Sequence, residues 1–389
     1  MENISIFLAL FFSLDRLIKL RTVIHFFNRT APNPPALWPT ISLIQPITRG
    51  ATNLEGNLHA CFNLDYPIQI QHILVCDAAD TQSQSICWEL QDYHTSLNIS
   101  VYLVEPDGTA IASKITKMNQ GLAHARGEVL GFIDDDIAPK PNAMTQMIPY
   151  LLQPGVGAAF GLPCAVRWNT IWSSLMSIFI NGNALISYIP LTYLTEPFTI
   201  TPHIFTISRH NFDDAGGFEG MSGRIDDDHE LARRLAAIRL KSVQTPVIYR
   251  VSNELVSFSE YTNQIKRWFA IPRQCMMPYL SLKQKTISSG LSLGLFIPSV
   301  VWLLTLIFPS TTTIICLVSI LLVHLGVYVF CSSLYLKPLM PMSQIPLVPI
   351  AGAIAPLQML WALLLGDNDI VWREQHLRLE TGGKFQLIE

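Results

Sequence analysis

The stretch KITKMNQGLAHARGEVLGFIDDD, residues 114–136, joins a polar segment to an apolar run that ends in three carboxylates. The apolar run, Val129–Ile133, is predicted to form a buried strand. The residues before it, from about 117 to 125, are predicted to form a helix. A helix that leads into a buried strand is the repeating unit of an α/β sheet domain.

Three adjacent carboxylates, Asp134, Asp135 and Asp136, end this predicted strand. Alternate side chains of an extended segment point the same way, so Asp134 and Asp136 are expected to converge while Asp135 points elsewhere. Two carboxylates suit a hard cation such as Mg²⁺ or Mn²⁺, with phosphate oxygens of a nucleotide substrate completing its shell. The sequence therefore predicts a metal site at Asp134 and Asp136.

The same alternation of strands and helices extends over residues 38–280. We expect buried parallel strands at Ile41–Gln45, Ile73–Cys76 and Val101–Val104, with a helix from about 54 to 64 between the first two. In a parallel sheet, ligands bind at the carboxyl ends of the strands. Polar residues at those ends are therefore the candidate site residues.

Asp77 and Asp80 follow the second of these strands, in ILVCDAAD. One of them is a candidate to accept hydrogen bonds from a nucleoside. An aspartate after a strand also commonly forms a turn or caps a helix, and this alternative stays open.

Two later motifs carry polar residues of the same kind. GRIDDDHELARRL places Asp226, Asp227 and Asp228 before a basic helical segment, where stabilisation of a helix N-terminus is the structural alternative. NQIKRWF contains Gln264, Arg267 and Trp268 just before an apolar region, where an anchor at a membrane interface is the alternative.

Composition separates this chain from an ordinary soluble protein. Of 389 residues, 50% are hydrophobic and 14% are charged, whereas soluble domains carry about 25% charged residues. A net charge of −3 gives no electrostatic case for binding nucleic acid. The seven cysteines are scattered without metal-ligand spacing and are expected to be reduced thiols.

Apolar segments gather at both ends of the chain. Residues 287–366 contain one lysine, one histidine and no acid or arginine, and three segments of membrane-spanning length fit there, the third kinked by prolines or re-entrant. Residues 1–30 are expected to form a membrane anchor. A cleaved signal peptide is the alternative, but its cations should precede the apolar run, and here they follow it.

Cations predict the orientation in the membrane. They cluster after the first apolar segment and before the first C-terminal one, and therefore flank the central domain on both sides. The tendency of cytoplasmic loops to be positive places residues 38–280 in the cytoplasm, as part of a multi-pass membrane protein. Three full spans would place the tail, 367–389, on the opposite side, whereas two spans and a re-entrant segment would keep it on the same side.

The stretch between Arg167 and Glu196 carries no charge over 28 residues. A full membrane span there would separate the acidic motifs that precede and follow it, so two other structures are considered. One is a buried core helix. The other is an interfacial helix through which a lipid enters, with Asn181 and Asn183 facing out.

Taken together, the order Asp…Asp-x-Asp…Asp…Gln-x-x-Arg-Trp, followed by apolar spans, resembles the glycosyltransferases of family 2, which have a GT-A fold. The stretches KITKMNQGLAHARGEVLGFIDDD and GGFEGMSGRIDDDHELARRL agree with this pattern. CDAADTQS and the tail segment VWREQHLRLETGG are similar to ceramide glucosyltransferases and their bacterial lipid-glycosyltransferase relatives. The tail departs from them at Glu374 and Gln375.

This resemblance implies an α/β GT-A domain, a mixed and mostly parallel sheet flanked by helices, with C-terminal transmembrane helices. The implied reaction is inverting transfer of a sugar, glucose from UDP-glucose, to a membrane lipid hydroxyl. The acceptor would be ceramide, diacylglycerol or a hopanoid-type lipid. A polysaccharide synthase is the competing interpretation, although it needs a wider helix bundle.

The resemblance also implies roles for individual residues. Asp228 would be the catalytic base, and Asp134 and Asp136 would hold Mg²⁺ or Mn²⁺. The donor would be bound by six residues at which the motifs match, namely Asp77, Asp80, Lys114, Gln264, Arg267 and Trp268.

Overall fold

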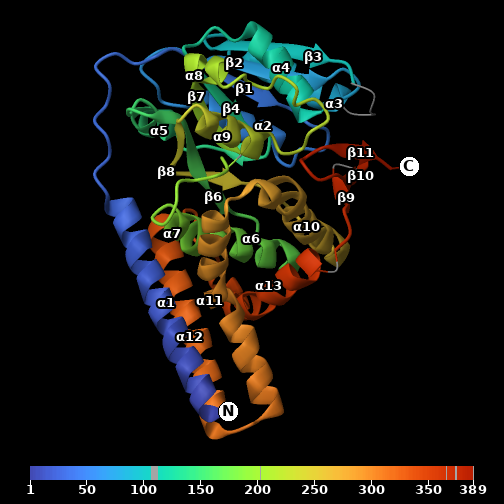
Figure 1. The fold of residues 1–389 in the computed structure, drawn as a ribbon. Helices are drawn as coiled ribbons and strands as arrows, with labels where there is room; N and C mark the ends of the chain where they lie inside the picture. The colour runs from blue at the N-terminus through green and yellow to red at the C-terminus, as the bar shows by residue number, and fades with distance from the viewer. Residues whose placement is uncertain (107–112, 202, 365, 373–374, 389) are drawn as a thin grey trace.

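The structure is a computed structural model that describes residues 1–106, 113–201, 203–364, 366–372 and 375–388. A globular domain built on a large sheet lies at one end, and three long helices extend away from it (Figure 1). Arg373 and Glu374, part of the tail motif, lie outside the described residues.

The central sheet has eight strands in the order β3-β2-β1-β4-β7-β6-β8-β5. Neighbours from β3 to β4 are parallel, β7 runs antiparallel to both β4 and β6, and β6 and β8 are parallel. The expected mixed and mostly parallel sheet is confirmed. Its strands are β1 (Ile41–Pro46), β2 (Gln71–Asp77), β3 (Asn98–Val104), β4 (Val129–Ile133), β5 (Ile137–Ala138), β6 (Val156–Ala165), β7 (Ile204–Ser208) and β8 (Lys241–Val251).

Helices cover both faces of this sheet, which explains why its strands are almost continuously apolar. They are α2 (Leu54–Phe62), α3 (Thr81–Tyr93), α4 (Lys114–His124), α5 (Ala143–Leu151), α8 (Arg209–Asp214) and α9 (Asp227–Ala237). Met144 and Met147 of α5 pack in one buried cluster with β1 and β4. Met118 of α4 and Leu231 of α9 pack in another, on Phe132.

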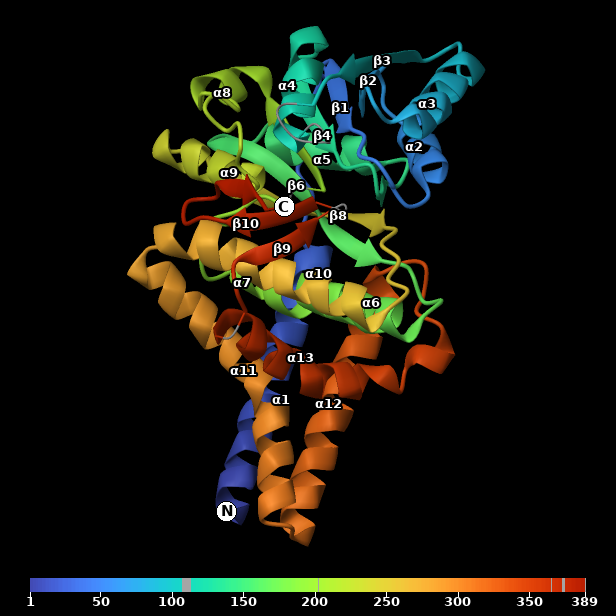
Figure 2. The ribbon, with the colours of Figure 1, turned by 90° about the vertical axis from the view of Figure 1, so that its right-hand side faces the viewer.

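Three long helices form the extended part of the molecule: α1 (Glu2–Asn28), α11 (Leu282–Ile307) and α12 (Thr311–Tyr335). They lie side by side in two perpendicular views (Figures 1 and 2). The N-terminal apolar segment continues through its charged middle as one helix of 27 residues, about 40 Å long. Its close packing on α12 and α11 makes α1 an integral member of the bundle.

Within the described residues, four helical segments are long and apolar enough to cross a membrane. Two are α11 and α12; the third is α13 (Leu347–Leu364), and the fourth is Ile171–Leu191. The length and composition of these helices are those of a membrane protein.

The segment Ile171–Leu191 consists of α6 (Ile171–Asn183), a π-helical turn η1 (Ala184–Tyr188) and α7 (Ile189–Leu191). It lies across the molecule between the sheet and the long helices, and 67% of its most apolar window is buried (Figure 2). Asn181 is buried and its amide exchanges two hydrogen bonds with the backbone of Ala165 at the end of β6. The expectation that Asn181 faces outward was therefore wrong, because the end of the strand requires a polar partner.

The tail returns to the globular domain. The helix α10 (Phe258–Ile271) is followed by the short turns η2 (Pro272–Met276) and η3 (Met277–Tyr279). Arg273 of η2 donates hydrogen bonds to the carbonyls of Ala362 and Leu363 at the end of α13. The turn η4 (Met342–Gln344) precedes α13. After α13 the tail forms a small sheet of β9 (Asp369–Trp372), β10 (Gln375–Leu379) and β11 (Phe385–Leu387).

The small tail sheet packs on the loop before α9. Phe385 N donates to Gly223 O at 3.2 Å, and Ile225 N donates to Gly383 O at 3.0 Å. The tail and the globular domain therefore lie on one side of the long helices. Of the two topologies left open by the sequence, this arrangement fits two spans followed by a segment that does not cross.

Candidate active site

A cavity of about 950 Å³ lies between the carboxyl edge of the sheet and the helices beneath it. Its polar wall comes from the ends of β1 and β4, from α10 and from the start of α9. Its apolar wall comes from α6, α11 and α13. Seven of the nine residues proposed as site residues from the sequence line this cavity: Lys114, Asp134, Asp136, Asp228, Gln264, Arg267 and Trp268.

The three carboxylates after β4 all line the cavity, but they differ in burial and in their partners. Asp134 and Asp136 are half-buried at the cavity wall. Asp135 is buried, and its Oδ2 accepts a hydrogen bond from Thr48 N at 2.6 Å. Its carbonyl accepts a second from the Asn57 amide at 2.9 Å. Asp135 therefore holds the loop after β1.

Lys114, the first residue of α4, joins two of the acidic motifs. Its Nζ lies 2.8 Å from Asp134 Oδ1 and 3.4 Å from Asp227 Oδ2. Burial lowers the pKa of Lys114, but Asp134 and Asp227 outweigh this and raise the pKa above its ordinary value. A permanently charged ammonium therefore lies among the carboxylates.

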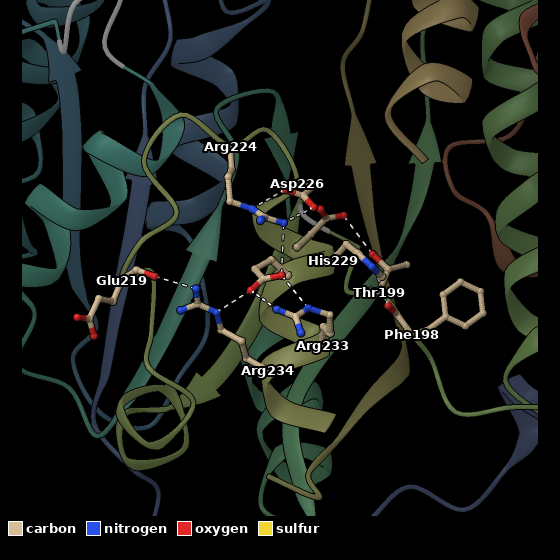
Figure 3. Close-up of polar contacts among 10 residues, drawn as sticks. Phe198, Thr199, Glu219, Arg224, Asp226, His229, Arg233 and Arg234 are labelled. Carbon is tan, nitrogen blue, oxygen red and sulfur yellow. Dashed lines mark hydrogen bonds and ion pairs between the residues drawn. The ribbon is translucent and has the colours of Figure 1, made fainter. Parts of the chain in front are cut away.

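The acidic motif at the start of α9 is held by an arginine network (Figure 3). Arg224 makes two hydrogen bonds to Asp226, at 3.0 and 2.8 Å, and a third to Glu230 at 3.3 Å. Glu230 also accepts from Arg233 and Arg234, one helical turn further on. These bonds fix the first turn of α9, on which Asp227 and Asp228 lie.

Asp228 is the carboxylate of this motif whose surroundings suit a proton acceptor. It is half-buried at the cavity wall, and its Oδ2 accepts from Thr199 Oγ1 at 3.3 Å. Burial, and then the neighbouring charge of Asp227, raise the pKa of Asp228 to about 7. A base with a pKa near neutral is efficient because it is both unprotonated and sufficiently basic.

Gln264, Arg267 and Trp268 share one face of α10 through their i, i+3 and i+4 spacing. Arg267 donates to Gln264 Oε1 at 2.9 Å, which orients the guanidinium. The Trp268 ring stacks on Phe179 of α6, with ring centroids 6.1 Å apart. The face thus joins a polar to an apolar part of the cavity.

Asp77 and Asp80 do not line the cavity. Asp77 is fully buried in an ion pair with Lys117, 2.9 Å away, which is equally buried. Asp80 caps α3 by accepting a hydrogen bond from Ser83 N at 3.3 Å, which is the helix-capping role given above as the alternative to nucleoside binding. The sequence motif contains Lys117, but its pairing with Asp77 across two elements is a tertiary contact that spacing does not reveal.

Other residues of the site were missed by sequence reasoning. The Glu230 network could have been found, since Arg233 and Arg234 follow Glu230 at helical i+3 and i+4 spacing. No sequence motif identifies Thr199, because it reaches Asp228 from a loop 29 positions away.

Asp134 and Asp136 fit a hard divalent cation in the chemistry of their donor atoms. Both offer carboxylate oxygens to one cavity, and such ions accept only one or two protein carboxylates when a diphosphate supplies the rest. Among the described residues, no group of three His, Cys, Asp or Glu side chains could hold a metal without such help. The cysteines take no part in it, since all seven are free thiols in buried positions.

The sheet, the acidic strand ends and the arginine-bearing helix together are those of a glycosyltransferase. The model of glycosyl transferase family 21 matches residues 3–385, and the chain belongs to that family. The glycosyltransferase class expected from the motifs is confirmed; the resemblance was drawn to family 2, and the matching model is that of family 21.

Solved glycosyltransferases have similar structures. The mannosyltransferase PcManGT from Pyrobaculum calidifontis, in complex with GDP-Man and Mn²⁺, is 18% identical, with a TM-score of 0.51 over 92% of this chain and 98% of that one. Residues 1–349 of S. aureus TarS, in complex with UDP-GlcNAc, are 13% identical, with a TM-score of 0.42 over 90% and 99% of the two chains. At these identities the first likeness shows a shared fold.

Proposed function

We propose that this protein is a membrane-bound, inverting glycosyltransferase that moves a sugar, glucose from UDP-glucose, to the hydroxyl of a lipid such as ceramide. One observation carries the proposal. A single cavity is lined by Asp134, Asp136 and Asp228 on one side and by apolar residues of α6, α11 and α13 on the other. A polar donor and an amphiphilic acceptor can meet only in a space of this dual character.

The donor half of the cavity suits a diphosphate. Negative charge develops on the leaving diphosphate as the glycosidic bond breaks, and preorganised cations stabilise it. Arg267 and Lys114 supply two such cations, and Gln264 orients the first. Asp134 and Asp136 would hold Mg²⁺ or Mn²⁺, which supplies further positive charge to the diphosphate when bound.

Asp228 would take the proton from the acceptor hydroxyl as its oxygen attacks the anomeric carbon. In this single displacement the new bond forms on the face opposite the leaving diphosphate, so an α-linked donor yields a β-glycoside. Thr199 donates to one oxygen of the Asp228 carboxylate and so helps to hold the group at the cavity wall. Trp268 and Phe179 form an apolar wall beside the acceptor.

Asp77 and Asp80 are retained in this proposal as supports of the nucleoside pocket. Their buried positions let them shape the loop at the end of β2, with Asp77 anchoring Lys117 and Asp80 fixing α3. Neither carboxylate lines the cavity, so their effect on a bound nucleoside would be indirect.

The membrane placement follows from charge and hydropathy. Lys283 and Lys285 at the start of α11 and Arg21 near the end of α1 lie at the globular end of the bundle. Cytoplasmic flanks of membrane helices are enriched in such cations, so we place the globular domain in the cytoplasm.

Lipid analysis tests the function. Membranes containing the chain are incubated with isotope-labelled nucleotide sugars, and extracted lipids are identified by mass spectrometry. Label from UDP-glucose in a β-glucosyl lipid supports the proposal. Label in insoluble polymer points to a polysaccharide synthase, and label in glycosylated diacylglycerol or a hopanoid-type lipid replaces ceramide as the acceptor.

A further inference from the structure

A charged cluster inside the helix bundle is not used by the proposed reaction. Asp15, Arg16 and Lys19 lie in the middle of α1 and face α11. Arg16 and Lys19 are only 1% and 2% exposed. Lys19 Nζ lies 3.1 Å from Asp15 Oδ1, and Arg16 Nη1 lies 3.7 Å from Asp15 Oδ2. Two cations therefore share one carboxylate, which leaves one excess positive charge in a buried place.

Part of this cluster has a structural explanation. Pro298 has no N–H, so the carbonyl of Gly294 loses its normal helical partner within α11. Arg16 Nη2 donates to that carbonyl at 3.5 Å, and Lys19 donates to Leu291 O at 2.9 Å. A Cβ at residue 294 would clash with Asp15, so the glycine permits the approach of the two helices.

The structural role does not satisfy the whole Arg16 guanidinium, although Nη2 donates to Gly294 O and Nη1 lies at ion-pair distance from Asp15. Its Nε and Nη1 have no hydrogen-bond partner, although both are buried. Phe12 covers one face of the group, with its ring centroid 4.6 Å from Cζ. Arg16 also lines the large cavity, together with Leu291, Leu295 and Pro298 of α11. Unsatisfied donors and an unbalanced charge are costly in such surroundings unless a ligand completes them.

We propose that Arg16 marks a binding site for the anionic headgroup of a membrane phospholipid, between α1, α11 and α12. The phosphate would balance the excess charge and accept from Arg16 Nε and Nη1. The apolar residues of α11 beside it, which belong to the apolar wall of the same large cavity, fit acyl chains, and this favours a lipid over free phosphate. The inference rests on the membrane placement of the proposed function and not on sugar transfer.

Lipid binding to the purified, delipidated full chain in a neutral detergent tests the site. Native mass spectrometry compares phosphatidylglycerol with phosphatidylcholine of the same chains, without nucleotide sugar. The wild type is expected to prefer phosphatidylglycerol by about tenfold, the value of one charge-assisted hydrogen bond. Equal binding of the two lipids overturns the proposal, and inorganic phosphate that competes at equal concentration overturns the choice of a lipid.

Substitutions distinguish binding at Arg16 from nonspecific attraction of an anionic lipid to the positive charges of the protein. Arg16→Met should abolish the preference, while Arg21→Met, which removes the same charge from an exposed position on the same helix, should retain it. Asp15→Asn raises the excess charge and should strengthen the preference, whereas a purely structural ion pair predicts no gain. If Arg16→Met does not fold, the wild type and Asp15→Asn still decide the outcome.

The two proposals fail separately. Absence of lipid selectivity in a protein that still transfers sugar overturns this inference alone. Selective lipid binding by a protein that transfers no sugar overturns the proposed function alone.

Discussion

At the scale of single residues, neighbours in the acidic motifs have divided roles. Asp226 is bonded to Arg224, Asp227 is paired with Lys114, and Asp228 accepts from Thr199 at the cavity wall. The same division separates Asp135, bonded to Thr48, from Asp136. Because adjacent side chains leave an extended or helical backbone in different directions, one substitution in each motif should affect chemistry and its neighbour should affect structure.

Asp228→Asn is expected to lower sugar transfer by at least about a hundredfold, because the amide cannot accept the acceptor proton. Donor binding, measured by calorimetry, should stay unchanged. Asp213→Asn, which changes an exposed carboxylate elsewhere in the domain, serves as the control. Near-normal transfer by Asp228→Asn would assign the base to Asp226 or Asp227.

The pH dependence of the rate follows from the same carboxylate. Its pKa of about 7 lies above the ordinary value, so it becomes protonated as pH falls through 7. Only the unprotonated form acts as a base, and kcat should therefore fall about tenfold per pH unit below 7 and level off above it. A carboxylate with a pKa of about 7 titrates over roughly pH 5.5 to 8. A value of kcat that stays constant over this range, measured under saturating substrates, would exclude this base.

Asp136→Asn is expected to weaken Mn²⁺ binding and reduce transfer more than Asp135→Asn does. Asp135→Asn should instead lower the melting temperature, since it disturbs the bond to Thr48 N. Chelation should abolish transfer by the wild type, and Mg²⁺ or Mn²⁺ should restore it. Metal titration and thermal melting of the two variants distinguish these effects, and equal losses of activity with equal metal affinity would contradict the assignment.

At the scale of elements, the loop before α9 depends on the tail sheet. Gly383 has φ +88°, and a Cβ there would overlap the carboxylate of Asp226. Its carbonyl also accepts from Ile225 N. The tail therefore contacts the residue that precedes the first turn of α9. On the proposed mechanism, Gly383 would be a positioning residue for Asp228.

Gly383→Ala is expected to reduce kcat while leaving donor affinity unchanged, because it displaces Asp226 and with it the first turn of α9. Gly220→Ala is the matched control: its φ is +67°, but nothing lies within 4 Å of the added Cβ. Both variants carry similar backbone strain, about 1 kcal/mol. Equal kcat values for the two variants, measured with their thermal stability, would show that the tail contact has no influence on catalysis.

The strands and helices show how much of the fold could be predicted from the sequence. Val129–Ile133 matches β4 at both ends, and the other three strands were placed within three residues, because continuous apolar runs define buried parallel strands. The expected helix at about 54–64 ends at Phe62. The strands β5, β6, β7 and β8 and the tail sheet were not predicted, since their pairing depends on contacts distant in the chain. The buried ion pair of Asp77 with Lys117 could not be predicted for the same reason.

At the scale of the whole molecule, the tail and the globular domain lie on one side of the bundle. Single cysteines introduced at His210 in the domain and at Gln386 in the tail are exposed, whereas the seven native thiols are buried. In sealed vesicles both variants should react equally with a membrane-impermeant maleimide, or both should be protected until detergent is added. Reaction of one and protection of the other would place the tail across the membrane.

The contact of Gly383 with the loop before α9 also bears on how the protein is made. The tail strands follow α11 and α12 in the chain, so a ribosome synthesises them after both helices. Until then the loop at Gly223–Asp226 lacks its backbone partners from Gly383 and Phe385. On the proposed mechanism, the loop before α9 would thus be completed only after the segments that form α11 and α12 have been synthesised.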